Sequence, residues 1–177
     1  MSGFSKGHRR VDIKLSWDPA PLGAPAHDLD LVAAAYPAAD PYGPPAYLVH
    51  FDSRAPDGTI ILQRESRDGR GYGADEVLTL DLYRVSESYG RIVVGVAIQQ
   101  PGARLPFGEV ARPKALVLEG HTELARHDLA QLPDATAATI AEFTREGSGT
   151  WRLESLSRGY DADPVEFAQV MGAAREG

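Results

Sequence analysis

Apolar and polar residues alternate along most of this chain, and this alternation limits the possible fold more than any other feature of the sequence. Residues 11–15, Val-Asp-Ile-Lys-Leu, are the clearest case. Successive side chains of a β-strand point to opposite faces, so the pattern predicts strands with one buried face. Further segments of strand length, separated by short turns, lie at 29–35, 47–51, 59–63, 77–82, 91–99, 115–118 and 151–156.

Residues 135–145 are ambiguous between a helix and a strand. The alanines of residues 135–145 favour a helix, whereas Thr139, Ile140 and Phe143 favour a strand, and we predict a strand that faces Trp151.

A turn is expected at 56–58, Pro-Asp-Gly, because proline fixes φ and glycine accepts a positive φ. Residues 47–63 are therefore predicted to form a hairpin.

One helix start is clear near the C-terminus. Asp163 is a candidate N-cap, Pro164 suits the first helical position, and Glu166 completes a capping-box pattern. A short helix is therefore predicted over 164–173. Many short strands with Gly/Pro turns favour an all-β fold, and we predict one antiparallel β-sandwich domain of two packed sheets spanning residues 1–177.

Composition limits the function classes. The chain of 177 residues contains no cysteine, which excludes disulfides and thiolate metal sites, and its formal net charge of −7 argues against a nucleic-acid partner. Its apolar runs are of strand length, so direct membrane insertion is not expected. The N-terminus has no apolar run typical of a signal peptide, and a cytoplasmic location is expected.

The strongest candidate site combines a glycine-rich acidic loop at 65–76 with the upstream segment Asp-Leu-Asp at 28–30. Gly69, Gly71 and Gly73 let the backbone adopt positive φ and turn its carbonyls inward. Calcium takes about 6–8 oxygen ligands from carboxylates, carbonyls and water. The two segments therefore predict a calcium site.

Electrostatics supports a cation at this place. Asp28 and Asp30 share one face of a strand, about 7 Å apart by strand geometry. If Asp75 or Glu76 comes close, each like-charged pair at ~5 Å costs on the order of 3 kcal/mol at an effective dielectric near 20. A positive group should neutralise this cluster. The alternative to calcium is an arginine of the loop, Arg67 or Arg70, paired with the carboxylates.

The sequence indicates an enzyme less strongly than it indicates a calcium site. The glycines of 69–73 lack the G-x-G-x-x-G spacing of a dinucleotide site, and a strand rather than a helix follows them. Gly-Ser-Gly at 147–149 is not a G-x-S-x-G nucleophile elbow. We expect a protein that is not an enzyme, and an unrecognised hydrolase site is the least favoured alternative.

An ordered series of motifs resembles the TerD family of bacterial tellurium-resistance and stress-response proteins. The motifs are Trp-Asp-Pro at 17–19, Asp-Leu-Asp at 28–30, Pro-Asp-Gly-Thr-Ile at 56–60, the loop at 65–76, the apolar strand at 92–98, Phe-Gly-Glu-Val at 107–110, His-Asp-Leu at 127–129, Thr-Ala-Ala-Thr-Ile-Ala-Glu-Phe at 136–143 and Trp-Arg-Leu-Glu-Ser-Leu-Ser-Arg-Gly-Tyr at 151–160.

The resemblance implies a calcium-binding β-sandwich without a settled enzymatic activity, which acts with other proteins of a stress-response complex. The candidate ligands are Asp28, Asp30, Glu65, Asp68, Tyr72, Asp75 and Glu76. Asp28, Asp30, Asp75 and Glu76 match the family pattern. The loop departs from that pattern at Glu65, Ser66, Asp68, Arg70, Tyr72 and Ala74. A metal-free adaptor of the same fold, with arginine in place of calcium, is therefore the alternative.

Overall fold

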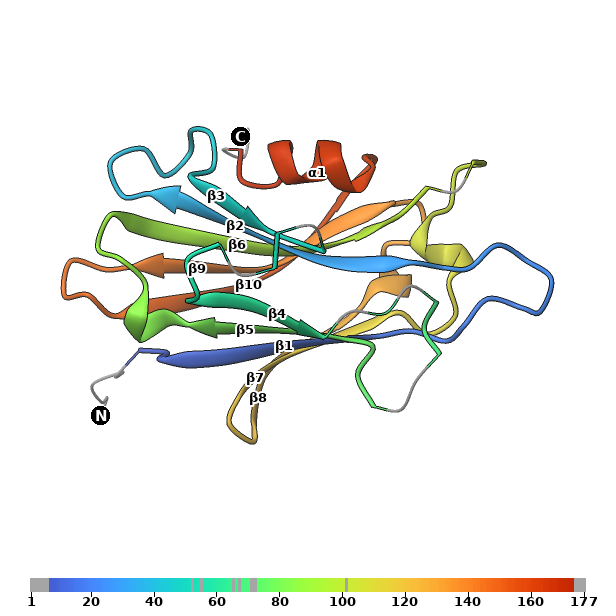
Figure 1. Ribbon diagram of the computed structural model, residues 1–177, viewed down its shortest axis with the longest axis horizontal. Helices are drawn as coiled ribbons and strands as arrows, with labels where there is room; N and C mark the ends of the chain where they lie inside the picture. The colour runs from blue at the N-terminus through green and yellow to red at the C-terminus, as the bar shows by residue number, and fades with distance from the viewer. Residues whose placement is uncertain are drawn as a thin grey trace.

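The part of the chain that the computed structural model describes, residues 7–173 except 52, 55, 65, 67, 71, 72 and 101, forms two five-stranded antiparallel sheets packed together (Figure 1). The first sheet has the order β4-β5-β1-β7-β8 and the second β10-β9-β6-β2-β3. The strands are β1 (Arg10–Ser16), β2 (Leu29–Pro37), β3 (Tyr47–Val49), β4 (Ile60–Arg64), β5 (Glu76–Asp81), β6 (Tyr89–Ile98), β7 (Lys114–Glu119), β8 (Thr122–Asp128), β9 (Ala137–Arg145) and β10 (Trp151–Tyr160).

The predicted β-sandwich is confirmed, and the apolar face of the alternating strand β1 is buried as predicted. Val11, Ile13 and Leu15, the apolar members of the alternating β1, are fully buried between the sheets. The ambiguous segment forms β9, which pairs with β10 so that Trp151 lies opposite Arg145. Strand β8 was not predicted, because its sequence is mostly polar and its residues are largely exposed.

The predicted hairpin at 47–63 is wrong. The turn residue Gly58 does have a positive φ, of 81°. However, β3 pairs with β2 in one sheet, whereas β4 pairs with β5 in the other. The connection therefore crosses between the sheets, and β3 pairs with the strand before it in the chain while β4 pairs with the strand after it.

Helix α1 (Pro164–Val170) lies on the outer face of the second sheet, over β2 and β6 (Figure 1). Asp163 caps it as predicted, accepting a hydrogen bond from the Glu166 amide at 2.9 Å, although the helix ends before 173. Phe167 packs directly on Gly95, where a Cβ atom would lie 2.4 Å from the ring. Within the described residues, no helix is long and apolar enough to cross a bilayer.

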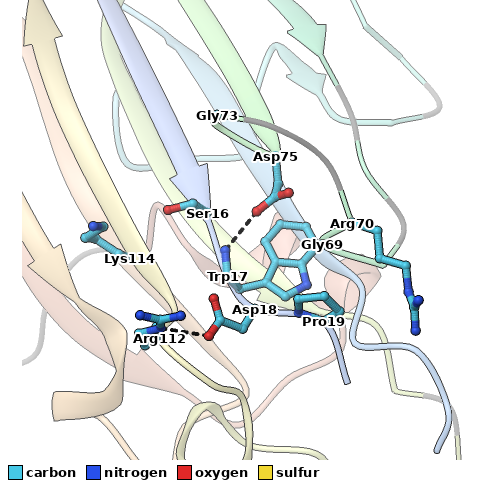
Figure 2. Close-up of a pocket in the computed structure, with 10 residues that line it drawn as sticks. All are labelled: Ser16, Trp17, Asp18, Pro19, Gly69, Arg70, Gly73, Asp75, Arg112 and Lys114. Carbon is cyan, nitrogen blue, oxygen red and sulfur yellow. Dashed lines mark hydrogen bonds and ion pairs between the residues drawn. The ribbon is translucent and has the colours of Figure 1, made fainter. Parts of the chain in front are cut away.

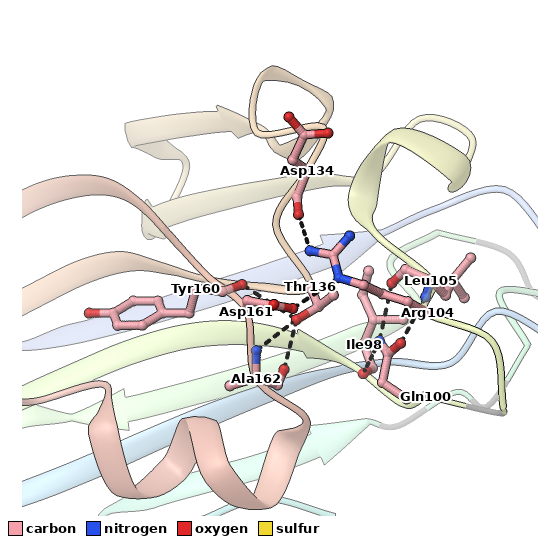
Figure 3. A network of polar contacts seen from close by, with 9 residues as sticks. All are labelled: Ile98, Gln100, Arg104, Leu105, Asp134, Thr136, Tyr160, Asp161 and Ala162. Atoms are coloured by element: carbon pink, nitrogen blue, oxygen red, sulfur yellow. Dashed lines mark hydrogen bonds and ion pairs between the residues drawn. The ribbon is translucent and has the colours of Figure 1, made fainter.

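A polar network fixes the chain just before α1 (Figure 3). The Thr136 hydroxyl accepts a hydrogen bond from the Ala162 amide and donates one to the Ala162 carbonyl, both at 2.9 Å. Arg104 bridges the carboxylate of Asp161, at 3.0 Å, and the carbonyl of Asp134. The helix is therefore held on the sheet from its N-terminal side.

Candidate metal centre

The candidate centre lies at an incomplete sheet edge. Strand β3 is short and pairs only with Ala33, Ala34 and Ala35 of β2, so β2 extends past it. In this extension the amide of Leu31 donates a hydrogen bond to Oε1 of Glu76 at 2.8 Å. A glutamate from the first sheet thus satisfies a backbone donor that a longer β3 would otherwise satisfy.

Glu76 comes into this position because of strand alternation. It continues the row of Leu78 and Leu80, whose side chains are buried between the sheets. Past Leu78, at the first residue of β5, the carboxylate meets Asp30 of β2 and Asp28, which immediately precedes β2. One oxygen from each of the three side chains lies within 4.8 Å of the others.

Gln99, which directly follows β6, contacts both aspartates. Its amide donates to the carbonyl of Asp28 at 2.9 Å, and its side-chain Nε2 donates to Oδ2 of Asp30 at 2.7 Å. The sequence analysis missed Gln99. The available signal was weak, since Gln99 is simply the first polar residue after the apolar run of β6.

The electrostatics of Glu76 is unusual. Its side chain is fully buried, and burial raises the pKa of the carboxyl far above its ordinary value. The negative charge of Asp30, and then that of Asp28, raises the pKa further, while the amides of Leu31 and Ser66 partly oppose the shift. Among the described residues, Oε2 of Glu76 has no hydrogen-bond partner of ordinary geometry.

This donor set fits a hard cation. A buried carboxylate oxygen without a partner is costly, and a bound cation removes that cost. Three carboxylates offer oxygen ligands only, as calcium prefers, and calcium–oxygen bonds of about 2.3–2.6 Å place ligand oxygens at separations similar to those of the triad. Asp28, Asp30 and Glu76 therefore form a possible metal site.

Asp75 lies on the opposite side of the chain from Glu76. Its Oδ2 accepts a hydrogen bond from the main-chain amide of Trp17 at 2.9 Å, as Figure 2 shows. Adjacent residues of an extended chain point to opposite faces, so Asp75 and Glu76 cannot both face the triad. The indole of Trp17 in turn donates to the carbonyl of His27, which immediately precedes the acidic segment.

The glycine loop packs on the same tryptophan. Gly69 has φ of 75°, and a Cβ atom there would lie 2.5 Å from Nε1 of Trp17, so glycine is required. Asp68, a predicted ligand, accepts a hydrogen bond from the amide of Arg70 at 2.9 Å. The predicted ligands Glu65 and Tyr72 lie outside the described residues.

Arg70 is one of the two arginines that could neutralise the carboxylates in place of calcium. Its Nε lies 3.9 Å from Oδ2 of Asp68, about half of the side chain is exposed, and it points away from Asp75 (Figure 2). Arg70 therefore pairs within its own loop. The other candidate, Arg67, lies outside the described residues, and an arginine-neutralised triad now depends on that residue.

Comparison with known proteins gives consistent matches over nearly the whole chain. The family model of the TerD domain matches residues 1–169. The uncharacterized protein YceE of Bacillus subtilis (strain 168) is 29% identical, covering 97% of this chain and 92% of its own. The tellurium resistance protein TerD of Serratia marcescens is 28% identical, covering 90% of this chain and 85% of its own.

Two solved structures are also similar to this chain over nearly its whole length. The crystal structure of SAV2460, a protein of unknown function, superposes with a TM-score of 0.93 at 52% identity, covering 96% of this chain and 100% of that one. A homologue of the telluride resistance protein TerD, SCO6318 from Streptomyces coelicolor A3(2), superposes with a TM-score of 0.92 at 47% identity, with the same coverage.

Proposed function

Because the chain belongs to the TerD domain family, we propose that it is a calcium-binding module in which Asp28, Asp30 and Glu76 hold the ion. One observation carries the proposal. Glu76 is fully buried beside two other carboxylates, and its Oε2 has no hydrogen-bond partner of ordinary geometry among the described residues. A divalent cation would coordinate all three carboxylates at once.

The ion would act as a link between the sheets. Glu76 belongs to the first sheet, and Asp30 to the second. A ligand that binds only the folded state stabilises it by RT ln(1 + [L]/Kd), which is about 2.7 kcal/mol at a concentration of 100 Kd. Calcium would therefore stabilise this end of the sandwich and the glycine loop that precedes Glu76.

The biological role that we propose is non-enzymatic. The relative from Serratia marcescens is named a tellurium resistance protein, which supports a role in that kind of stress response. In this proposal the metal-ordered loop presents a surface to other proteins of a stress-response complex. No covalent step is required of the chain, because the bound ion changes only the stability and the order of that surface.

The test is calorimetric titration with calcium after removal of metal by a chelator. We expect one calcium ion to bind the wild type, and we expect Glu76→Gln to weaken binding at least tenfold while keeping the acceptor for the Leu31 amide. Asp68→Asn is the matched control, since Asp68 already serves the Arg70 amide. Its calcium affinity should stay within about twofold of wild type.

Two results would contradict the proposal. One is the absence of both heat and a shift in melting temperature at millimolar calcium, which would favour the metal-free adaptor with Arg67 at the triad. The other is equal loss of affinity in Glu76→Gln and Asp68→Asn, which would place the ion elsewhere. Titration with magnesium identifies the ion, because magnesium demands shorter bonds and octahedral geometry.

A further inference from the structure

A second cavity adjoins the metal centre on the outer face of the second sheet. Its volume is about 300 Å³, at the lower end of the range for small-molecule sites. Val32, Leu48, Phe51 and Ala168 form its apolar wall, and Asp30 and Gln99 lie in its polar wall. Asp30 is therefore shared between this cavity and the triad.

The helical wall of this cavity is held in place at both ends. Asp163 caps α1, and Thr136 holds the preceding Ala162 through both main-chain groups. Beyond the helix, Arg91 donates to the carbonyl of Gly172 at 2.6 Å. A wall fixed in this way lets a ligand bind without first ordering the helix, which favours affinity.

The rim of the cavity is unusually apolar for a solvent-facing position. Val165 lines the cavity and is 75% exposed. It lies on α1 directly after Pro164, which lines the same cavity. A ligand with an apolar body would cover both the wall and this rim.

Charge determines what the polar end accepts. Asp30 is the acidic side chain of the wall and is only 3% exposed. Its carboxylate is oriented by Gln99, and carboxyl oxygens of Asp28 and Glu76 lie behind it. His50 is the other titratable side chain of the wall. An anion is therefore repelled and a cation attracted.

We propose that this cavity binds a small organic cation, an amine carried on an apolar body about the size of one aromatic ring. The ammonium donates to Asp30, and the body lies against Val32, Leu48 and Ala168. Calcium and the amine then compete for Asp30, and each lowers the affinity for the other by the same factor. Amine binding itself needs no metal, so it goes beyond the proposed calcium function.

The test uses the full chain in chelator at about pH 8, with phenethylamine as the probe and hydrocinnamate as its anionic counterpart. Amide NMR spectra should show saturable shifts at Leu48, Gln99 and Ala168 with phenethylamine. We expect hydrocinnamate to bind at least tenfold more weakly. Calcium should raise the apparent dissociation constant of phenethylamine.

Variants locate the site. Asp30→Asn keeps an oxygen for the Gln99 donor but removes the charge. It should weaken the binding of phenethylamine by about tenfold to a hundredfold. Ala168→Phe fills the cavity and should abolish binding. Val165→Ser should weaken binding severalfold, whereas the control Val170→Ser, an exposed valine of the same helix that is not among the cavity-lining residues, should leave it unchanged.

Three results overturn the inference: no saturable binding of phenethylamine to the folded wild type, equal binding of hydrocinnamate, or unchanged affinity in Asp30→Asn. Binding of hydrocinnamate only when calcium is present would also overturn it, by showing that the polar end takes anions through the metal. Because the amine arm contains chelator, its failure leaves the calcium proposal standing, and failure of the calcium titration leaves the amine result standing.

Discussion

The second sheet contacts two buried glutamates in opposite environments, one at Glu142 and one at Glu76. Glu142 receives two hydrogen bonds from Arg91, at 3.1 and 3.4 Å, and both side chains are nearly inaccessible. The guanidinium also lies between the rings of Tyr36 and Tyr42, at 5.0 and 4.4 Å from their centroids. Glu76, in contrast, faces two further carboxylates.

The difference separates a structural acid, Glu142, from an acid that we propose binds a cation, Glu76. At Glu142 the chain supplies its own cation, with main-chain carbonyls of Pro41 and Gly172 satisfying the rest of Arg91. At Glu76 burial and like charges raise the pKa. A structural role alone would be served better by an apolar side chain, so the acidic triad is better explained by a cation that comes from solution.

The largest expected effect is at the structural pair. Arg91→Met should lower the free energy of unfolding by about 3–5 kcal/mol, because it leaves Glu142 buried without its cation. Urea unfolding measures this loss. The double variant Arg91→Met/Glu142→Leu should recover a substantial part of it, and a double variant less stable than the single one would contradict the comparison.

The same kind of experiment at Glu76 should give the opposite sign. In chelator at neutral pH, Glu76→Gln should raise the free energy of unfolding by about 1–3 kcal/mol, since the amide keeps the acceptor for Leu31 and removes the cost of protonating a buried carboxyl above its ordinary pKa. Unfolding in urea with and without calcium reports the effect. Wild type should gain stability from calcium and Glu76→Gln should not. A clear loss of stability in metal-free Glu76→Gln would show that Glu76 is structural like Glu142.

Stability should depend on pH in a way that calcium reverses. The folded-state pKa of Glu76 lies above its unfolded value, so the folded state binds more protons and metal-free stability falls as pH rises above the ordinary glutamate range. Calcium requires the deprotonated form. The increase in melting temperature caused by calcium should therefore grow between about pH 6 and 8, at about 2–4 °C per kcal/mol.

His127 provides an internal check on that experiment. Burial lowers its pKa, so its contribution to stability is lost as pH falls below the ordinary histidine range. This residue lies on β8, at the far edge of the first sheet from β4, and acts equally with and without calcium. The difference between the melting temperatures measured with and without calcium at each pH therefore cancels the contribution of His127. A calcium effect that is flat or shrinks with rising pH would contradict the role of Glu76.

The smallest effect is expected at Arg70. Its guanidinium is half exposed and pairs with Asp68, so it acts on the triad only through a screened field. Arg70→Glu should strengthen calcium binding about two- to threefold in calorimetry at low salt, and less at high salt. Arg152→Glu, the same charge change on β10 at the opposite edge of the second sheet from β3, is the control. Equal effects of both variants would show only a response to net charge.

Local sequence was sufficient to predict the sandwich, because β1 alternates and β6 and β9 are mostly apolar runs of strand length. It was insufficient for pairing, and the hairpin at 47–63 was wrong because β3 pairs with the preceding strand β2 in one sheet and β4 with the following strand β5 in the other. The site was predicted in part. The family resemblance indicated both Asp75 and Glu76, whereas period-two geometry alone places them on opposite faces. No sequence pattern marks the role of Gln99, which depends on the β2–β6 register.

The most direct measurement is a crystal structure of the wild type grown with calcium, in which the ion is located by its anomalous signal. We expect one ion bound at about 2.3–2.6 Å to oxygens of Asp28, Asp30 and Glu76. A triad without an ion in calcium-containing crystals, with the guanidinium of Arg67 among the carboxylates, would contradict this expectation.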